Sequence, residues 1–205
     1  KVVVDTGIGT LTSLSGYARR TVHLNYDFDG TYADLVYADQ VTPQKTAQQS
    51  VDWVINACHN GDLTIGGMYF YDHYNPYIRN YGANRALASF TYRPLTTNAY
   101  AIYAEATAHL GDALTISAGG RYSSESKDAG YFEVPGNVPS PLIQPARKKA
   151  NFSAFTPRGV LRYELADRTN VHASVSQGFR TGTFPLTPAP LPSPSLPITP
   201  DRITS

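Results

Sequence analysis

The sequence predicts an all-β fold in which antiparallel strands follow one another up and down as a meander. Three observations lead to this prediction. Apolar and polar residues alternate over long segments, turn residues separate these segments, and the connections between them are alternately short and long. Aromatic residues make up 12% of the 205 residues, including 15 tyrosines, and charged residues only 16%. This composition is typical of a tyrosine-rich sheet.

The clearest alternation runs from Phe152 to Arg180, as two strands joined by a polar turn at residues 166–169. If Leu165 pairs with Thr169, the apolar residues of both strands share one face and the polar residues the other. The expected pairs are Tyr163 with Val171, Leu161 with Ala173, Phe155 with Phe179, Arg162 with His172 and Arg158 with Ser176. Pro157 lacks an N–H group for the ladder, so we expect a local bulge there.

The other strands are weaker but follow the same pattern. Residues 2–4 are expected to be the tail of a strand, and about seven strands follow; those before the hairpin lie at residues 10–20, 46–56, 63–71, 98–110 and 113–123. Pairing Ala108 with Leu114 keeps the apolar residues of the last two on one face. Residues 21–45, 72–97 and 124–150 are predicted as long polar loops, and residues 181–200 as a proline-rich loop.

Strand length and loop order together indicate a membrane barrel. The strands of the hairpin have ten or more residues, and a strand that crosses a bilayer needs about 9–11. Outer-membrane barrels alternate short turns with long loops and carry aromatic girdles. The aromatic residues at the long-loop ends of the strands are Tyr17, Tyr69, Tyr71, Tyr100, Tyr122, Phe155 and Phe179. We therefore predict the wall of a transmembrane β-barrel.

Several other classes of protein are excluded or disfavoured. The net charge of +1 gives no electrostatic footprint for nucleic acid. A single cysteine, Cys58, rules out an internal disulfide and a cysteine-built zinc site. No apolar run reaches the ~18 residues of a membrane-spanning helix. The abrupt start at Lys1 suggests a piece of a longer protein.

The polar face of the predicted wall carries the residues that invite a chemical role. We expect it to line a lumen as a cross-strand ladder of Glu105, Arg121, Arg158, Arg162, Glu164, His172, Ser174, Ser176 and Arg180. His172 beside two serines suggests catalysis, but residues two apart on a strand point in parallel and do not converge. The acidic stretch at Asp27 to Gly30 lacks the closing Glu of a calcium loop. No enzyme, metal site or cofactor is expected.

Several segments resemble the barrel strands of TonB-dependent outer-membrane receptors. Two of them are residues 10–17 and 63–70. The strongest resemblance covers residues 152–158, 161–164 and 174–182. Residues 198–203 are similar to the segment that leads into the next strand in this family. The resemblance implies a plugged barrel in the outer membrane, in contact with its lipid, that imports iron–siderophores or similar scarce ligands with energy from TonB. The TonB box, the plug and a terminal strand are not found in this sequence. Compared with this family, residues 1–205 are therefore expected to form a partial, open section of a large transmembrane β-barrel that does not close or transport alone.

The resemblance also suggests where a ligand is bound. Arg79, Tyr81, Arg85 and Arg93 lie in the second long loop and are plausible contacts for an anionic chelate. The alternative is a surface or secreted β-sheet adhesin that binds through its tyrosine-rich loops. Such a soluble sandwich would cover its apolar face with a second sheet, whereas a barrel exposes that face to lipid.

Overall fold

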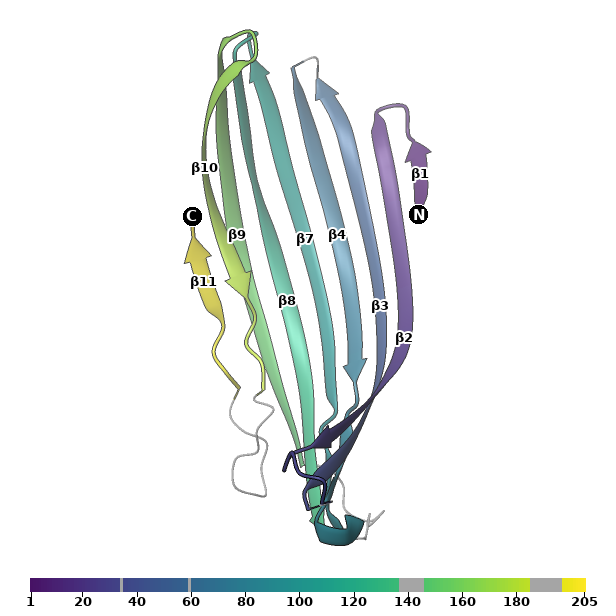
Figure 1. The fold of residues 1–205 in the computed structure, drawn as a ribbon. Coiled ribbons are helices and arrows are strands. Elements are labelled where there is room, and N and C mark those ends of the chain that lie inside the picture. Colours follow the sequence, from purple (N-terminus) through teal and green to yellow (C-terminus); the bar gives the residue numbers. More distant parts are fainter. Residues whose placement is uncertain (34, 59, 137–145, 185–196) are drawn as a thin grey trace.

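The computed structural model describes residues 1–33, 35–58, 60–136, 146–184 and 197–205. These residues form one curved antiparallel sheet of eleven strands, with the short turns at one end and the long connections at the other (Figure 1). The strands are β1 (Val2–Asp5), β2 (Gly9–Asp27), β3 (Tyr37–Cys58), β4 (Gly61–Tyr74), β5 (Tyr77–Tyr81), β6 (Leu87–Tyr92), β7 (Leu95–Leu110), β8 (Leu114–Pro135), β9 (Ala146–Ala166), β10 (Thr169–Arg180) and β11 (Asp201–Thr204). The predicted antiparallel meander is confirmed.

The sheet does not close within the part of the chain that is described. Its strand order is β1-β2-β3-β4-β7-β8-β9-β10-β11, with β5 and β6 beside the main path. The predicted count of about seven strands is too low, because β5 and β6 lie in a segment that was predicted as a loop, and β11 follows the last strand that was predicted. The open wall agrees with the expectation of a partial barrel.

Two prolines explain why β5 and β6 are separate strands. β3 pairs with β4 at Gln44↔Tyr74 and with β5 at Val41↔Tyr77, so the register carries through Pro76 unchanged. β8 likewise pairs with β7 at Ala129 and with β6 at Phe132, on either side of Pro94. Each proline removes one ladder donor without redirecting the chain. β4 with β5, and β6 with β7, are therefore each one long interrupted strand.

The long connections are much shorter than the sequence suggested. Most of residues 21–45, 72–97 and 124–150 extends the hairpins as strands, and a short 3-10 turn spans Ala83–Arg85. The sequence prediction failed there because the period-two contrast between faces disappears once both faces of a strand meet water. Residues 137–145 and most of the proline-rich segment lie outside the described residues.

The register of the clearest hairpin is confirmed over most of its length. Tyr163 pairs with Val171, Leu161 with Ala173, Arg162 with His172 and Arg158 with Ser176. At the turn the prediction was wrong, since Thr169 pairs with Ala166 and a bulge displaces Leu165 from the ladder. The β7–β8 prediction was wrong by two residues, because Leu114 pairs with Leu110. A shift of two preserves the faces, so the pattern could not detect it.

Pro157 acts differently from the expected bulge. The β8–β9 register passes through Gly120↔Pro157 without a shift, while the β9–β10 pairing stops at Arg158↔Ser176, one residue short of it. Because Pro157 has no N–H to donate, β10 separates from β9 there, while the other edge of β10 pairs with β11. The expected Phe155–Phe179 pair therefore does not form, and Phe155 lies opposite Tyr122.

The apolar face of the sheet is uncovered in the described structure. Ile102 is 68% exposed, Val175 60% and Phe155 57%. No second sheet lies over these residues, since the described strands all belong to one sheet. A soluble sandwich would bury these side chains, so this arrangement disfavours the sandwich and fits a face that contacts lipid.

Aromatic side chains mark one boundary of this apolar face. Tyr69 lies directly opposite Tyr100, and Tyr122 opposite Phe155. A lateral row is the set of residues that lie directly opposite one another across neighbouring strands. Tyr17 of β2 lies in the same lateral row as Tyr71 of β4, whereas Phe155 of β9 lies in the row of Gly67, which is four residues nearer the turn end of β4. From Tyr17 to Phe155 the aromatic row is therefore displaced by about 13 Å along the strands, over a distance of about 24 Å across five strand spacings. This displacement corresponds to strands tilted by roughly 30° from the normal to the aromatic row. This value is close to the tilt of membrane barrels, so the aromatic row can lie level at a membrane surface.

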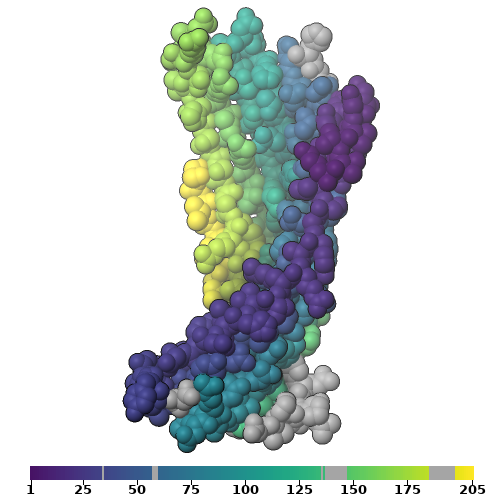
Figure 2. Space-filling model, turned by 45° about the vertical axis from the view of Figure 1, so that its right-hand side comes forward, coloured from purple at the N-terminus to yellow at the C-terminus, as the bar shows by residue number. Residues whose placement is uncertain are grey.

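Beyond the aromatic row the sheet continues into a polar extension. In Figure 2 the lower part of the molecule leans to one side, where the ends of β2 and β3 lie beside β5. Most of the buried residues lie in or near this extension and include Ala38, Val41, Thr42, Thr91, Ala129, Tyr131 and Val134. No helix among the described residues is long and apolar enough to cross a membrane.

Asp29 holds the tip of the β2–β3 hairpin together. Its carboxylate accepts hydrogen bonds from the Thr31 side chain and from the N–H groups of Thr31, Leu35 and Val36. The Thr31 hydroxyl contributes most to lowering the pKa of Asp29 to about 2. The carboxylate oxygens of Asp29 are therefore engaged by the loop itself, and Asp29 acts as a cap of the hairpin tip.

The Asp29 cap predicts a defined pH dependence for this tip. A depressed pKa means that the stabilisation is fully present above the unfolded value of 3.8 and is lost as pH falls through about 2. Protection of the Leu35 and Val36 amides against exchange, measured relative to an unstructured chain, should therefore stay high at pH 4 and fall toward pH 2. Asp29→Asn should show fast exchange at both pH values. A flat profile in the wild-type protein would contradict the capping role.

Candidate functional site

The polar face carries charged pairs that bridge three strands. Arg158 on β9 contacts Glu105 on β7, with 3.2 Å between Nη1 and Oε2. The residue between them in the lateral row is Gly119 of β8, and a Cβ there would lie 2.9 Å from Cβ of Glu105. The missing side chain leaves the space through which the two partners meet. Arg158 is 59% exposed, so the pair contributes little to stability by itself.

A second bridge on this face also crosses a glycine. The Tyr103 hydroxyl on β7 donates a hydrogen bond to Asp52 on β3, over Gly66 of β4. A Cβ on Gly66 would lie 2.3 Å from the Tyr103 ring. The Arg121 guanidinium lies 5.7 Å from the centroid of the same ring. Asp52, Tyr103 and Arg121 therefore form one connected polar layer across β3 to β8.

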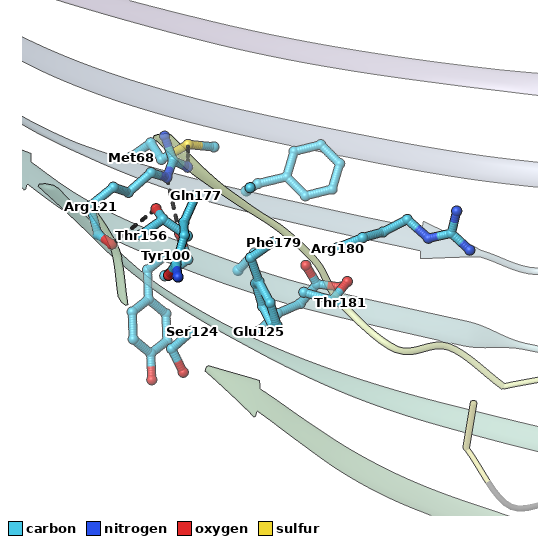
Figure 3. Close-up of a pocket in the computed structure, with 14 residues that line it drawn as sticks. Met68, Tyr100, Arg121, Ser124, Glu125, Thr156, Gln177, Phe179, Arg180 and Thr181 are labelled. Carbon is cyan, nitrogen blue, oxygen red and sulfur yellow. Dashed lines mark hydrogen bonds between the residues drawn. The ribbon is translucent and has the colours of Figure 1, made fainter. Parts of the chain in front are cut away.

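A cavity lies where β10 departs from β9, on the same polar face. It has a volume of about 500 Å³ and a mixed lining (Figure 3). Arg121, Glu125, Thr156 and Gln177 supply polar groups, while Met68 and Phe179 supply apolar surface. A second hollow of about 270 Å³ shares Arg121, Thr156 and Gln177 and continues past Tyr103, Glu105 and Arg158. Together they form a continuous recess at and below the level of the aromatic row.

Arg121 is the cation of this cavity with no acidic partner in the described structure. Its Nε donates to Ser123 Oγ at 3.0 Å, and Nη2 lies 2.8 Å from the Met68 sulfur. Thioether sulfur is a weak acceptor, so the positive charge is not neutralised. By contrast, Arg180 is 84% exposed and points away from the other labelled side chains in Figure 3, with Asp201 at 3.9 Å.

The other end of the cavity is closed by the chain that follows β10. The Thr181 hydroxyl donates to Glu125 at 2.9 Å, and Lys127 Nζ donates to the Gly182 carbonyl at 2.8 Å. Lys127 and Glu125 also form a 3.0 Å ion pair whose side chains are only 12% and 19% exposed. This half-buried pair fixes residues 181–184 against the polar face and leaves Phe184 buried.

The remaining predicted wall residues lie nearer the turn end of the same face. Arg162 donates to Glu164 at 2.7 Å, and His172 lies opposite Arg162 in the ladder. Ser174 lies opposite Val160, and Ser176 contacts the Ser205 hydroxyl at 3.1 Å. No cluster of three potential metal ligands occurs among the described residues. The lumen-lining role of these residues stays a prediction.

Three of the four residues suggested for ligand binding lie together, and the fourth, Arg93, lies apart from them. Arg79 pairs with Asp39 at 3.2 Å, while Tyr81 and the Arg85 guanidinium both lie against the Tyr37 ring. Because side chains alternate along a strand, Arg79, Tyr81 and Tyr37 lie on the same face as Tyr69. Between the aromatic row and the turn end, this face is the apolar one. Arg93 lies on the polar face, 5.6 Å from the Tyr131 ring centroid. Their binding role stays a prediction, but it cannot be a single shared site.

Arg93 belongs to a polar group beyond the aromatic row. The Tyr131 hydroxyl donates to Glu133, and burial together with this acceptor raises the pKa of Tyr131 to about 12. Tyr131 therefore stays protonated as a donor at physiological pH. It is one of the buried residues of the extension and helps to fix the rim above the recess.

Sequence reasoning missed several residues of the recess. The recess is lined or closed by five residues that were not predicted, namely Met68, Tyr103, Glu125, Lys127 and Thr181. For two of them, Tyr103 and Glu125, the sequence held a signal, because each is an even number of residues from a predicted wall residue on the same strand. Glu125 and Lys127 were placed in a loop because β8 was expected to end at Ser123. The inward position of Thr181 depends on β10 leaving β9, which the pattern does not encode.

These features define a section of an outer-membrane β-barrel wall with a polar lumen face. The chain belongs to the TonB-dependent receptor family, because residues 4–200 match its family model, "TonB dependent receptor-like, beta-barrel". The fold is similar to the crystal structure of the ferric yersiniabactin uptake receptor FyuA from Yersinia pestis, with a TM-score of 0.81 at 15% identity. That match covers 98% of this chain and 30% of the receptor chain. No curated protein matches the chain.

Family membership places the chain in the outer membrane. Barrels of this family lie in the outer membrane, and the family comprises transporters rather than enzymes. Barrels of this kind have short periplasmic turns and long extracellular loops. The turn end of the sheet accordingly faces the periplasm, and the polar extension faces the outside.

The glycine under Tyr103 gives a test of the polar layer. Gly66→Ala should lift the ring and lose its bond to Asp52, lowering the free energy of unfolding by about 1–3 kcal/mol. Gly67→Ala is the matched control, since its Cβ would meet only the Ala101 carbonyl at 3.6 Å. Denaturant unfolding of the receptor in detergent would measure both. Equal effects would show that Gly66 has no special role.

The Lys127 contacts predict how the segment after β10 is held. Lys127→Met removes both the ion pair to Glu125 and the bond to the Gly182 carbonyl, so amide exchange at residues 182–184 should accelerate. Lys149→Met is the control, because its ammonium is 73% exposed and pairs only weakly with Asp128. Unchanged exchange in Lys127→Met would mean that other contacts hold the segment.

Proposed function

We propose that this wall belongs to a receptor that takes up a scarce anionic ligand, such as an iron–siderophore, with energy from TonB. The observation that carries the proposal is the unneutralised Arg121 in a recess of about 500 Å³ at the outer end of the polar face. An arginine without a carboxylate partner, beside aromatic and thioether surface, is suited to bind the charged rim of an organic chelate.

The position of the recess supports the same role. A ligand from outside meets the polar extension first and then the recess at the level of the aromatic row. The second hollow leads on toward Glu105 and Arg158, where charges of both signs already pair. A ligand would therefore be attracted at Arg121 and held less strongly below it, which favours onward movement. The similar structure is that of a ferric yersiniabactin uptake receptor, which agrees with a ferric chelate as cargo.

In this proposal residues 1–205 form one part of the barrel domain of a longer receptor. The contact with TonB belongs to parts of the receptor outside this chain. The contribution of this chain is the lumen wall and the outer recess.

Uptake of radioiron-labelled ferric siderophores tests the function. Cells that lack their own ferric siderophore receptors would express the full-length receptor and be offered catecholate, hydroxamate and phenolate-type chelates. Uptake of at least one chelate that stops without TonB is expected. Absence of uptake for the whole panel would contradict an iron–siderophore cargo.

Arg121 can then be tested with the transported chelate. Arg121→Gln should raise the half-saturating concentration about tenfold or more, because a hydrogen bond to a charged group contributes about 1.5–3 kcal/mol. Arg162→Gln is the control, since Arg162 is already paired with Glu164 at 2.7 Å. An equal loss in both variants would assign the effect to general lumen charge rather than to the recess.

A further inference from the structure

Two exposed cations face each other on the lipid side of the sheet. Arg19 on β2 pairs directly with Lys45 on β3. Both side chains are exposed, and neither has a hydrogen bond or ion pair with any described residue. Like charges directly opposite each other in an antiparallel pair destabilise it. An anion from outside the chain would relieve this repulsion.

The place of this pair relative to the membrane is defined by the aromatic row. Arg19 is two residues beyond Tyr17 on the same strand, and Lys45 is two residues beyond Ala47, which lies opposite Tyr17. Both therefore lie on the face of the aromatic row, about 7 Å along the strands beyond it. That depth is where lipid headgroups meet a barrel, since aromatic girdles lie at the membrane–water interface.

The surroundings leave the charge of the pair uncompensated. The next residue in the lateral row is His73, whose Nδ1 contacts the Thr96 hydroxyl at 2.9 Å. The nearest carboxylate in sequence to His73 is Asp72, which lies on the opposite face and accepts hydrogen bonds from Gln44 and Thr46. Along this face of β3, the nearest acid is Asp39, six residues from Lys45 and already paired with Arg79.

We propose that Arg19 and Lys45 form a binding site for the phosphate of an anionic lipid headgroup in the outer leaflet. The guanidinium offers a fork of N–H donors and the ammonium a point charge, and together they can hold one phosphate group between β2 and β3. A lipid is the occupant because the pair lies on the lipid-facing side, at headgroup depth, and away from the lumen. This inference uses the barrel fold and is independent of the transported ligand.

Lipid retention tests the site. The full-length receptor, purified in detergent, would be exchanged into mixed micelles of phosphatidylcholine and phosphatidylglycerol, and its bound lipid identified by native mass spectrometry. The wild-type protein should retain phosphatidylglycerol in preference to phosphatidylcholine. Arg19→Gln with Lys45→Gln should weaken this preference roughly fivefold for each cation removed, which is the effect of one basic side chain at an anionic lipid surface.

Two further variants keep the test decisive. Arg20→Gln is the matched control, because Arg20 is the next residue of β2, lies on the opposite face and donates to Gln44 at 2.8 Å. It should leave lipid retention unchanged. Lys45→Glu places an acid opposite Arg19, so the fold should gain stability while lipid preference is lost.

Three results would overturn the proposal. One is wild-type lipid preference in the doubly substituted receptor. Another is an equal loss in Arg20→Gln, which would reflect net charge alone. The third is complete displacement of the lipid by inorganic phosphate at physiological ionic strength, which would show a simple anion site instead of a lipid site.

Discussion

The structure depends on one constraint, which is that strands in an apolar layer must satisfy their backbone hydrogen bonds with neighbouring strands. The antiparallel ladder meets this requirement, and its period of two then divides every strand between a lipid face and a lumen face. All other features follow from that division. The aromatic row, the lipid-side cations and the lumen recess differ only in which face they occupy and how far along the strand they lie.

Glycine and proline modify the ladder at the positions that matter for the site. Gly66 and Gly119 remove side chains from the middle of a lateral row, so that Tyr103 reaches Asp52 and Arg158 reaches Glu105 across three strands. Pro157 removes one donor and allows β10 to leave β9, which opens the cavity beside Arg121. Pro76 and Pro94 interrupt the ladder without changing its register. The same chemical property, a missing N–H, therefore has different consequences in the interior and near the end of a pairing.

Charge is distributed differently on the two faces. On the lumen face several charges are paired, as in Arg158–Glu105, Arg162–Glu164 and Lys127–Glu125, whereas Arg121 is an exception, a cation of the recess without a carboxylate partner in the described structure. On the lipid side, Arg19 and Lys45 face each other without any acid. Both exceptions lie near the level of the aromatic row. A barrel wall of this kind can thus present one cationic site to a ligand inside and another to lipid outside.

The sequence by itself determined the fold class, the faces, most of the β9–β10 register and the membership in the receptor family, because alternation is a local property of each strand. It did not determine the β7–β8 register, since a shift of two residues leaves the alternation unchanged. It also missed the strand extensions, where both faces meet water and the contrast vanishes. Only the tertiary structure decided that Arg79, Tyr81 and Arg85 separate from Arg93, and that Glu125 and Thr181 meet at the recess. Those contacts join residues from different strands, and they depend on where β10 departs from the wall.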